Sequence, residues 1–197
     1  MEIENFLHGK KKVQQLVKTE NYQKTTFTLY DDGSLLAESV PDEPFKTYCR
    51  LSDEIKFSKD VQAKLAACEA SYDILGDFVR AWLKDTAKLP DTILCRDVGV
   101  ELYLRLGQWD KARAAISKIA TAKAYSDGGQ DALKHLERYR QAADSAIKFL
   151  RANPGFQQNK IYDALPEVDR DCLKNFIRSS YLIRKEKSGN TNRLYAK

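Results

Sequence analysis

The pattern of hydrophobic and polar residues in the first part of the chain, up to about residue 57, is that of short β-strands separated by a turn. Two segments rich in β-branched, aromatic and aliphatic residues, 25–30 and 34–39, flank the turn Asp31-Asp32-Gly33. The glycine of this turn can supply the positive φ that a tight hairpin needs, so a β-hairpin is predicted here. Two prolines then interrupt the pattern, and residues 45–51 could add a short third strand. Residues 1–57 are therefore expected to form a β-rich segment.

From Ser58 onward the apolar residues recur three or four positions apart, which is the period of a helix that buries one side. A first helical run starts at Ser58 and ends at Leu89-Pro90. Gly107-Gln108 and residues 126–129 are turns between the later helices. These later helices are expected at residues 93–106, 109–124 and 130–152. Residues 58–141 are therefore predicted to be a helical body.

The helix pair at residues 93–124 has small and aromatic residues at a recurring spacing. These residues are Tyr103, Gly107, Trp109 and Ala112. The pattern resembles one tetratricopeptide-like hairpin, and it occurs once in the chain. A single such unit cannot bury its own face, so the resemblance implies that the hairpin packs against the helices on either side.

The last part of the chain changes pattern again after Asn153-Pro154-Gly155, which stops the long helix. A short helix is expected over residues 156–165, followed by a turn and a second helix over residues 168–180. The second helix has an apolar side made of Val168, Cys172, Leu173, Phe176 and Ile177. Two short strands, 181–187 and 191–197, then flank a glycine-containing turn and are predicted to form a basic hairpin.

Charge separates this C-terminal part from the rest of the chain. The 197 residues are 43% hydrophobic and 31% charged, which is enough to bury one core, and the formal net charge is +5. Residues 151–197 hold ten Lys and Arg against five Asp and Glu, whereas residues 1–150 are balanced. A basic end on a neutral body is typical of a module that binds a polyanion, although surfaces without such a partner also carry a modest excess.

The succession of a long helix, an NPG break, a short helix, a turn, a second helix and the sequence YLIRKEKSGNTNRLYAK resembles the winged helix-turn-helix family over residues 142–197. The resemblance implies that the second helix enters the major groove of DNA while the wing lies along phosphate. The nucleic-acid-binding residues it implies are Gln157, Gln158 and Lys160 from the first helix, Arg170, Lys174, Asn175 and Arg178 from the second, and Arg184, Lys185, Lys187, Asn190 and Arg193 from the wing.

Three acidic residues at the start of the second helix, Glu167, Asp169 and Asp171, oppose this interpretation because carboxylates there repel phosphate. Acids in a first turn also complement the helix dipole, so they are compatible with a simple structural role. Two functions therefore remain open. One is a DNA-binding regulator, and the other is an interaction scaffold in which a winged helix that follows helical repeats contacts protein.

Motifs for catalysis, metal binding or membrane insertion are missing from the sequence. The four cysteines are far apart with no C-x-x-C pair, and His8 and His135 have no partners at a recognisable spacing. There is no nucleotide-binding loop, no zinc-protease motif, no nucleophile elbow and no apolar run of about 20 residues. We therefore expect no enzyme activity, no cofactor, no metal and no membrane contact. Residues 1–12 lack the pattern of a signal peptide, so a cytoplasmic location is expected.

Together these patterns predict an α+β fold that is mainly α. Its parts are a β-rich segment at 1–57, a helical body at 58–141 and a winged helix at 142–197. The expected function is regulation through double-stranded DNA, with the N-terminal body binding a protein partner or a second copy of the chain to form a homodimer. Dimerisation is expected because one such module buries only about 600–1,000 Å² on DNA.

Overall fold

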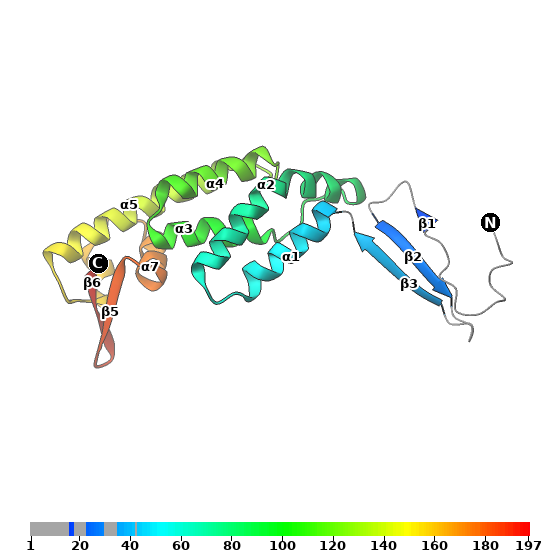
Figure 1. The fold of residues 1–197 in the computed structure, drawn as a ribbon. Helices are drawn as coiled ribbons and strands as arrows, with labels where there is room; N and C mark the ends of the chain where they lie inside the picture. Colours follow the sequence, from blue (N-terminus) through cyan, green and yellow to red (C-terminus); the bar gives the residue numbers. More distant parts are fainter. Residues whose placement is uncertain (1–15, 18–22, 30–34, 42) are drawn as a thin grey trace.

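The computed structural model describes residues 16–17, 23–29, 35–41 and 43–197. Most of these residues lie in helices, and a three-stranded antiparallel sheet lies near the C-terminus (Figure 1). The predicted class, α+β and mainly α, is confirmed. Residues 1–12, with His8 and the lysine run at 10–12, and the turn at residues 31–33 lie outside the described residues.

Three strands precede the helices. They are β1 (Leu16–Val17), β2 (Gln23–Leu29) and β3 (Leu35–Pro41), which pair antiparallel in the order β1-β2-β3. The third strand expected at residues 45–51 is wrong, because α1 (Glu43–Phe57) covers these residues. Tyr48, Leu51 and Ile55 are buried at helical spacing. Pro44 lies in the first turn of α1, where the N–H that proline lacks would have no helical partner in any case.

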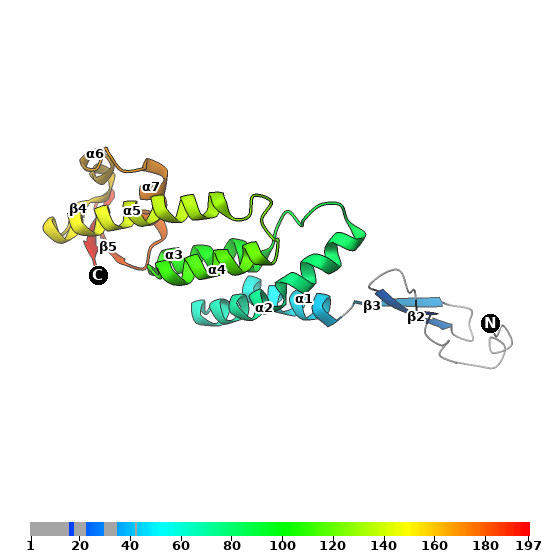
Figure 2. The same ribbon diagram turned by 90° about the horizontal axis from the view of Figure 1, so that it is seen from above.

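The helix α2 (Val61–Asp85) follows α1 and packs against it (Figures 1 and 2). It begins where the carboxylate of Asp60 accepts hydrogen bonds from the backbone N–H groups of Gln62 and Ala63, at 2.7 and 3.3 Å. The ring of Tyr48 stacks on that of Phe78 with centroids 3.8 Å apart. Aromatic packing therefore joins the first two helices.

A π-helical turn, η2 (Cys95–Gly99), leads directly into α3 (Val100–Leu106). This turn lies so close to α2 that a Cβ on Gly99 would be 2.1 Å from the hydroxyl oxygen of Tyr72. That hydroxyl donates a hydrogen bond of 3.1 Å to the carbonyl of Cys95. Gly99 therefore allows the close approach of the two helices.

The helix α3 ends at Gly107, which has a φ of +71°. The amides of Gly107 and Gln108 donate to the carbonyls of Leu104 and Tyr103 at 3.1 and 2.9 Å, so the last carbonyls of α3 are satisfied. The helix α4 (Trp109–Thr121) follows at once, and the predicted turn at Gly107-Gln108 is confirmed. The resemblance of α3 and α4 to a tetratricopeptide-like hairpin stays a prediction.

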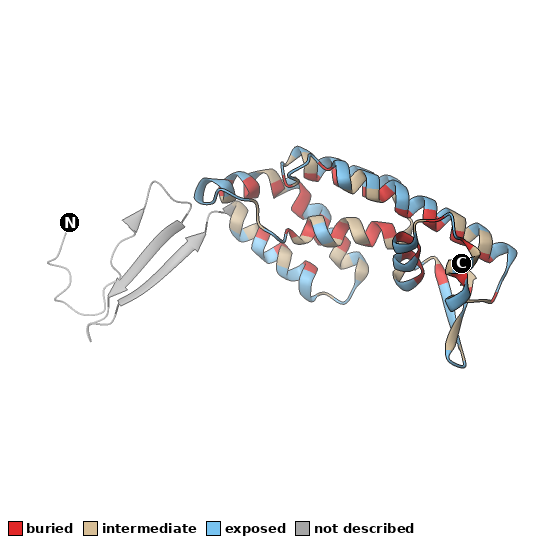
Figure 3. Cartoon of the chain, turned by 180° about the vertical axis from the view of Figure 1, so that it is seen from behind, coloured by how far each residue is buried: buried red, intermediate tan, exposed pale blue. Residues whose placement is uncertain are grey.

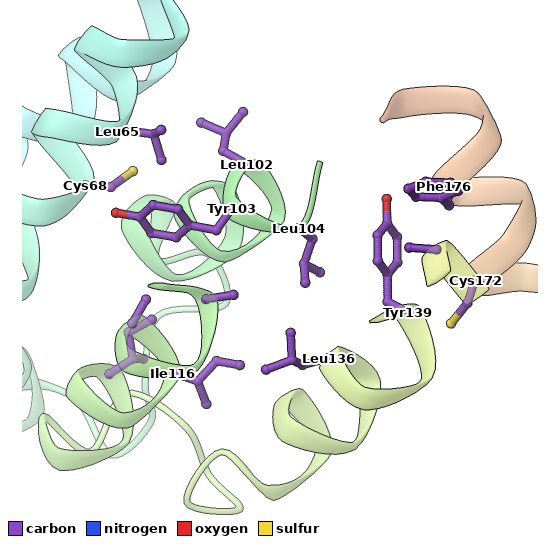
Figure 4. Close-up of a cluster of buried hydrophobic side chains, with 14 of the residues drawn as sticks. Leu65, Cys68, Leu102, Tyr103, Leu104, Ile116, Leu136, Tyr139, Cys172 and Phe176 are labelled. Atoms are coloured by element: carbon purple, nitrogen blue, oxygen red, sulfur yellow. The ribbon is translucent and has the colours of Figure 1, made fainter. Parts of the chain in front are cut away.

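The helix α5 (Gln130–Ala152) has the bounds expected from the sequence and runs from the helical body into the C-terminal part (Figure 2). Its Tyr139 lies 6.3 Å from the ring of Trp109 in α4. The same Tyr139 ring lies edge-on to Phe176, at 6.0 Å, in the C-terminal part (Figure 4). From here on, helical body means α1 to α4, and not the predicted range 58–141. Residues 153–197 are called the C-terminal unit, and α5 belongs to the core of both.

The C-terminal unit begins with a strand, where the sequence predicted a helix over residues 156–165. This expectation is wrong in its first part, because Phe156 and Gln157 form β4 and pair with Leu194 and Arg193. The remaining elements are η3 (Gln158–Lys160), α6 (Ile161–Ala164), α7 (Arg170–Ser179), β5 (Ile183–Ser188) and β6 (Thr191–Ala196). The sheet has the order β4-β6-β5. The second helix, α7, starts two residues later than predicted.

The segment between α7 and β5 is fixed to the end of α3. The carbonyl of Arg105 accepts hydrogen bonds from the amide of Tyr181, at 2.9 Å, and from the hydroxyl of Ser180, at 3.2 Å. The side chain of Leu182 lies against Gly107, where an added Cβ would be 2.7 Å from Leu182 Cδ1. Buried residues continue from the helical body into the C-terminal unit (Figure 3), so the two share one core.

Candidate nucleic-acid interface

The helix α7 has one buried side and one exposed side. Cys172, Leu173, Phe176 and Ile177 are buried against the core. The four residues that the resemblance placed on this helix, Arg170, Lys174, Asn175 and Arg178, are all exposed. The exposed residue Asp171 lies 3.7 Å from the ammonium of Lys174. The solvent-facing side of α7 is therefore accessible and basic, with one carboxylate near its start.

The acidic residues at the start of α7 have different surroundings. Asp169 is the N-cap, and its carboxylate accepts hydrogen bonds from the amides of Cys172 and Asp171 at 2.9 and 3.1 Å. The hydrogen bond from the Cys172 amide, together with Arg138 of α5 at 3.5 Å, holds the pKa of the Asp169 carboxyl below its usual value. The carboxylate of Asp169 therefore has hydrogen-bond and ion-pair partners within the protein, whereas Glu167 is exposed to solvent.

The β5–β6 hairpin has two different faces. Residues directly opposite each other in an antiparallel pair project from the same face, and successive residues alternate. Ile183 and Leu194 are both buried, and Leu194 is opposite Lys185. We call the face that carries them the inner face, and its polar residues are Lys185, Lys187 and Asn192. The outer face carries Arg184, Glu186, Arg193 and Tyr195.

On the inner face, Lys185 connects the hairpin to α7. Its ammonium donates a hydrogen bond of 2.8 Å to the carbonyl of Arg178. This carbonyl lies in the last turn of α7, where carbonyl groups lack a helical partner and a cation is favourable. Partial burial there lowers the pKa of the Lys185 ammonium. Farther along the same face Lys187 is exposed, and the amide of Asn192 donates to Gln158 Oε1 at 2.8 Å.

On the outer face, the cations interact with neighbours of the same face. The guanidinium of Arg184 lies 4.4 Å from the ring centroid of Tyr195 and forms an ion pair with Glu186. Arg193 Nε donates to the hydroxyl of Ser188 at 3.4 Å. Asn190 is exposed at the tip of the hairpin. The five predicted residues of the hairpin are thus divided, with Lys185 and Lys187 on one face, both arginines on the other and Asn190 at the tip.

The three residues that the sequence placed on the first helix, Gln157, Gln158 and Lys160, are not in an α-helix. Gln157 is in β4 opposite Arg193, so it belongs to the outer face. Gln158 and Lys160 are in the 3-10 turn η3, where Gln158 is half-buried and Lys160 is exposed. Asn192 was missed by the sequence interpretation, although the alternation of residues along the hairpin places it beside Lys187.

Other chemistry is sparse in the part of the chain that the structure describes. Within it, no group of three or more His, Cys, Asp or Glu residues could hold a metal ion. None of its helices is both long and apolar enough to cross a membrane. No protein-family model, curated protein or solved structure matches this chain.

Proposed function

We propose that residues 142–197 act as a winged helix-turn-helix that binds double-stranded DNA, and that the protein is a DNA-binding regulator. One observation carries the proposal. Lys174, Asn175 and Arg178 of α7 are exposed, and the hairpin that carries Lys185 and Lys187 is joined to the end of the same helix by a hydrogen bond. Cations from two elements therefore lie next to one another and can meet a single anionic surface.

The shape of these elements also supports the proposal. The major groove of B-DNA is about 12 Å wide and admits one α-helix. The helix α7 has its polar side in solvent along its whole length, while the buried side fixes it to α5 through contacts such as that of Phe176 with Tyr139. A rigid helix beside a basic hairpin is the arrangement by which a winged helix positions itself on a duplex.

A second candidate, a protein-binding scaffold, is favoured by exposed residues at the two ends of α7. Glu167 and Asp171 are exposed at its start, and Tyr181, just beyond its end, is 42% exposed. Mixed charge with an exposed aromatic residue is common where proteins meet. In this alternative the helical body and α7 would both contact protein, and the chain would not bind duplex DNA even at low salt. In the favoured proposal the body serves assembly, as a homodimer or with a protein partner.

The test is a titration of fluorescein-labelled, mixed-sequence duplex DNA with the full chain, followed by fluorescence anisotropy at about 50 and about 200 mM salt. Removing one cation that neutralises a phosphate should lower the slope of log K against log salt by about 0.9. We expect binding that weakens steeply with salt. The double variant Arg178→Ala with Lys187→Ala should bind less tightly and have a shallower slope.

The matched control removes one positive charge from the opposite end of the helical body. Lys88 is exposed in the segment after α2, which ends far from α7 and the hairpin (Figure 1), and Lys88→Ala should leave the affinity unchanged. The proposal fails if the wild-type chain does not bind the duplex at low salt. It also fails if Lys88→Ala weakens binding as much as the removal of Lys187, because the net charge alone would then account for binding.

A further inference from the structure

The net charge of the C-terminal unit is not spread evenly over α7 and the hairpin. The first turn of α7 carries Arg170, but it also carries the exposed Asp171 and follows the exposed Glu167. The later turns carry Lys174 and Arg178. Because the acidic residues lie at its start, the net positive charge of α7 is highest toward its C-terminal end.

The N-terminal end of α7 is also closed to an anion. Free amides at the start of a helix attract phosphate, because they carry the positive end of the helix dipole. In α7 the amides of Asp171 and Cys172 already donate to the carboxylate of Asp169, which also forms an ion pair with Arg138. The carboxylates of Asp169 and Asp171 would repel an approaching phosphate at this end.

The hairpin has the same asymmetry between its faces. Among the described residues of the inner face and of the C-terminal half of α7, none is acidic. On the outer face Glu186 pairs with Arg184, which also stacks on Tyr195. The hydrogen bond from Lys185 to the carbonyl of Arg178 makes the inner face continuous with the end of α7. The acid-free cationic surface thus runs from Arg178 through Lys185 to Lys187.

From this asymmetry we infer that a DNA duplex docks on the C-terminal half of α7 and on the exposed part of the inner face of the β5–β6 hairpin, at Lys187, and leaves the first turn of α7 and the outer face free. The inference rests on the proposed function and names the surface that performs it. Lys185 is then a positioning residue, which holds the hairpin against α7. Arg178 and Lys187 are the phosphate-contacting cations of the docking surface.

Two matched pairs of variants test this footprint in the duplex titration. Within the hairpin, Lys187→Ala removes a charge from the inner face and Arg193→Ala removes one from the outer face. Within α7, Arg178→Ala and Arg170→Ala remove charges from the two ends of one exposed side. We expect Lys187→Ala and Arg178→Ala each to weaken binding about tenfold and to lower the salt slope by about 1. The other two variants should change affinity less than about twofold.

A fifth variant, Asp171→Asn, keeps the size of the side chain and removes its charge. It should leave affinity within about twofold of wild type if the first turn stays away from the duplex, because a screened charge more than a Debye length of about 8 Å away has little effect. Far-UV circular dichroism and the thermal midpoint of every variant establish that a loss of binding is not a loss of fold.

The possible results separate this inference from the proposed function. Wild-type binding with equal losses for both members of each pair overturns the footprint and leaves the DNA-binding proposal standing. Larger losses for Arg170→Ala and Arg193→Ala, or a clear gain for Asp171→Asn, overturn it as well. The absence of wild-type binding at low salt overturns the proposed function and the footprint together.

Discussion

Replacing Ser180 by alanine tests whether the helical body and the C-terminal unit form one cooperative structure. Ser180 is one of the few buried polar residues, with 7% of its surface exposed. Its hydroxyl donates to the carbonyl of Arg105 at 3.2 Å and accepts from the amide of Leu182 at 3.0 Å. The first bond reaches back to α3, and the second orients the chain as it enters β5. Ser180 therefore links the two parts.

The expected loss of stability depends on which hydrogen bonds the two partners of Ser180 keep in the variant. The Arg105 carbonyl keeps the hydrogen bond from the Tyr181 amide, at 2.9 Å, whereas the half-buried Leu182 amide loses its hydroxyl acceptor. Two hydrogen bonds of about 0.5–1.5 kcal/mol each, one of which leaves a donor poorly solvated, predict a loss of about 2 kcal/mol. For a chain of this length that corresponds to a fall in Tm of about 4–8 °C.

The neighbouring residue provides the control. The hydroxyl of Ser179 donates to the carbonyl of Asn175 within α7, at 2.7 Å, and Ser179→Ala should change stability by less than about 0.5 kcal/mol. Urea unfolding is followed by far-UV circular dichroism and by the fluorescence of Trp82 and Trp109, which both lie in the helical body. In Ser180→Ala the two signals should shift together. Equal stability of the two variants, or a circular dichroism transition that separates from the fluorescence transition, would refute the reasoning.

Three further predictions follow from the local geometry. Gly76→Ala should stabilise α2 by about 0.5–1 kcal/mol, because an added Cβ meets nothing within 4 Å. Gly99→Ala should destabilise the chain, because its Cβ would clash with Tyr72, and thermal unfolding measures both effects. Asp169→Ala should cost about 1 kcal/mol at neutral pH as a lost N-cap. Because the folded state lowers the pKa of Asp169, this cost is fully present above about pH 4 and shrinks as the pH falls further, which urea unfolding across that range measures. A thiol reagent at neutral pH should modify the exposed Cys49 well before the three buried cysteines. Burial raises the pKa of those three thiols to about 11 or 12, and unfolding should abolish the difference in rate.

The long helices could be predicted from the sequence because each has its own apolar stripe. The bounds of α5 agree with the prediction at both ends, since a glycine precedes it and Asn153-Pro154-Gly155 follows it. The segment from residue 45 to 51 was assigned wrongly because the prolines were interpreted as breaks. Tyr48 and Ile55 are spaced as on a helix, and Pro44 is tolerated in a first turn. The periodicity was the better guide there.

The C-terminal unit was harder to predict because its first strand depends on a distant partner. Phe156 and Gln157 look like the start of a helix locally, and only their pairing with β6 makes them a strand. The spacing of the apolar residues in α7 does predict which of its residues are exposed. The division of the hairpin into two faces also follows from alternation, but the attachment of Lys185 to the carbonyl of Arg178 is a tertiary contact that no local pattern indicates.

The way in which the two parts share α5 determines what the C-terminal unit can do. Tyr139 contacts Trp109 of the body on one side and Phe176 of α7 on the other, so the position of α7 depends on both. The ion pair of Arg138 with Asp169 attaches the start of α7 to α5, and the hydrogen bond from the Tyr181 amide to the Arg105 carbonyl attaches its end to α3. Because α7 is held at both ends, we expect a movement of α3 or α4 to be transmitted to its exposed face. The body therefore sets the orientation of the basic surface, whichever partner that surface meets.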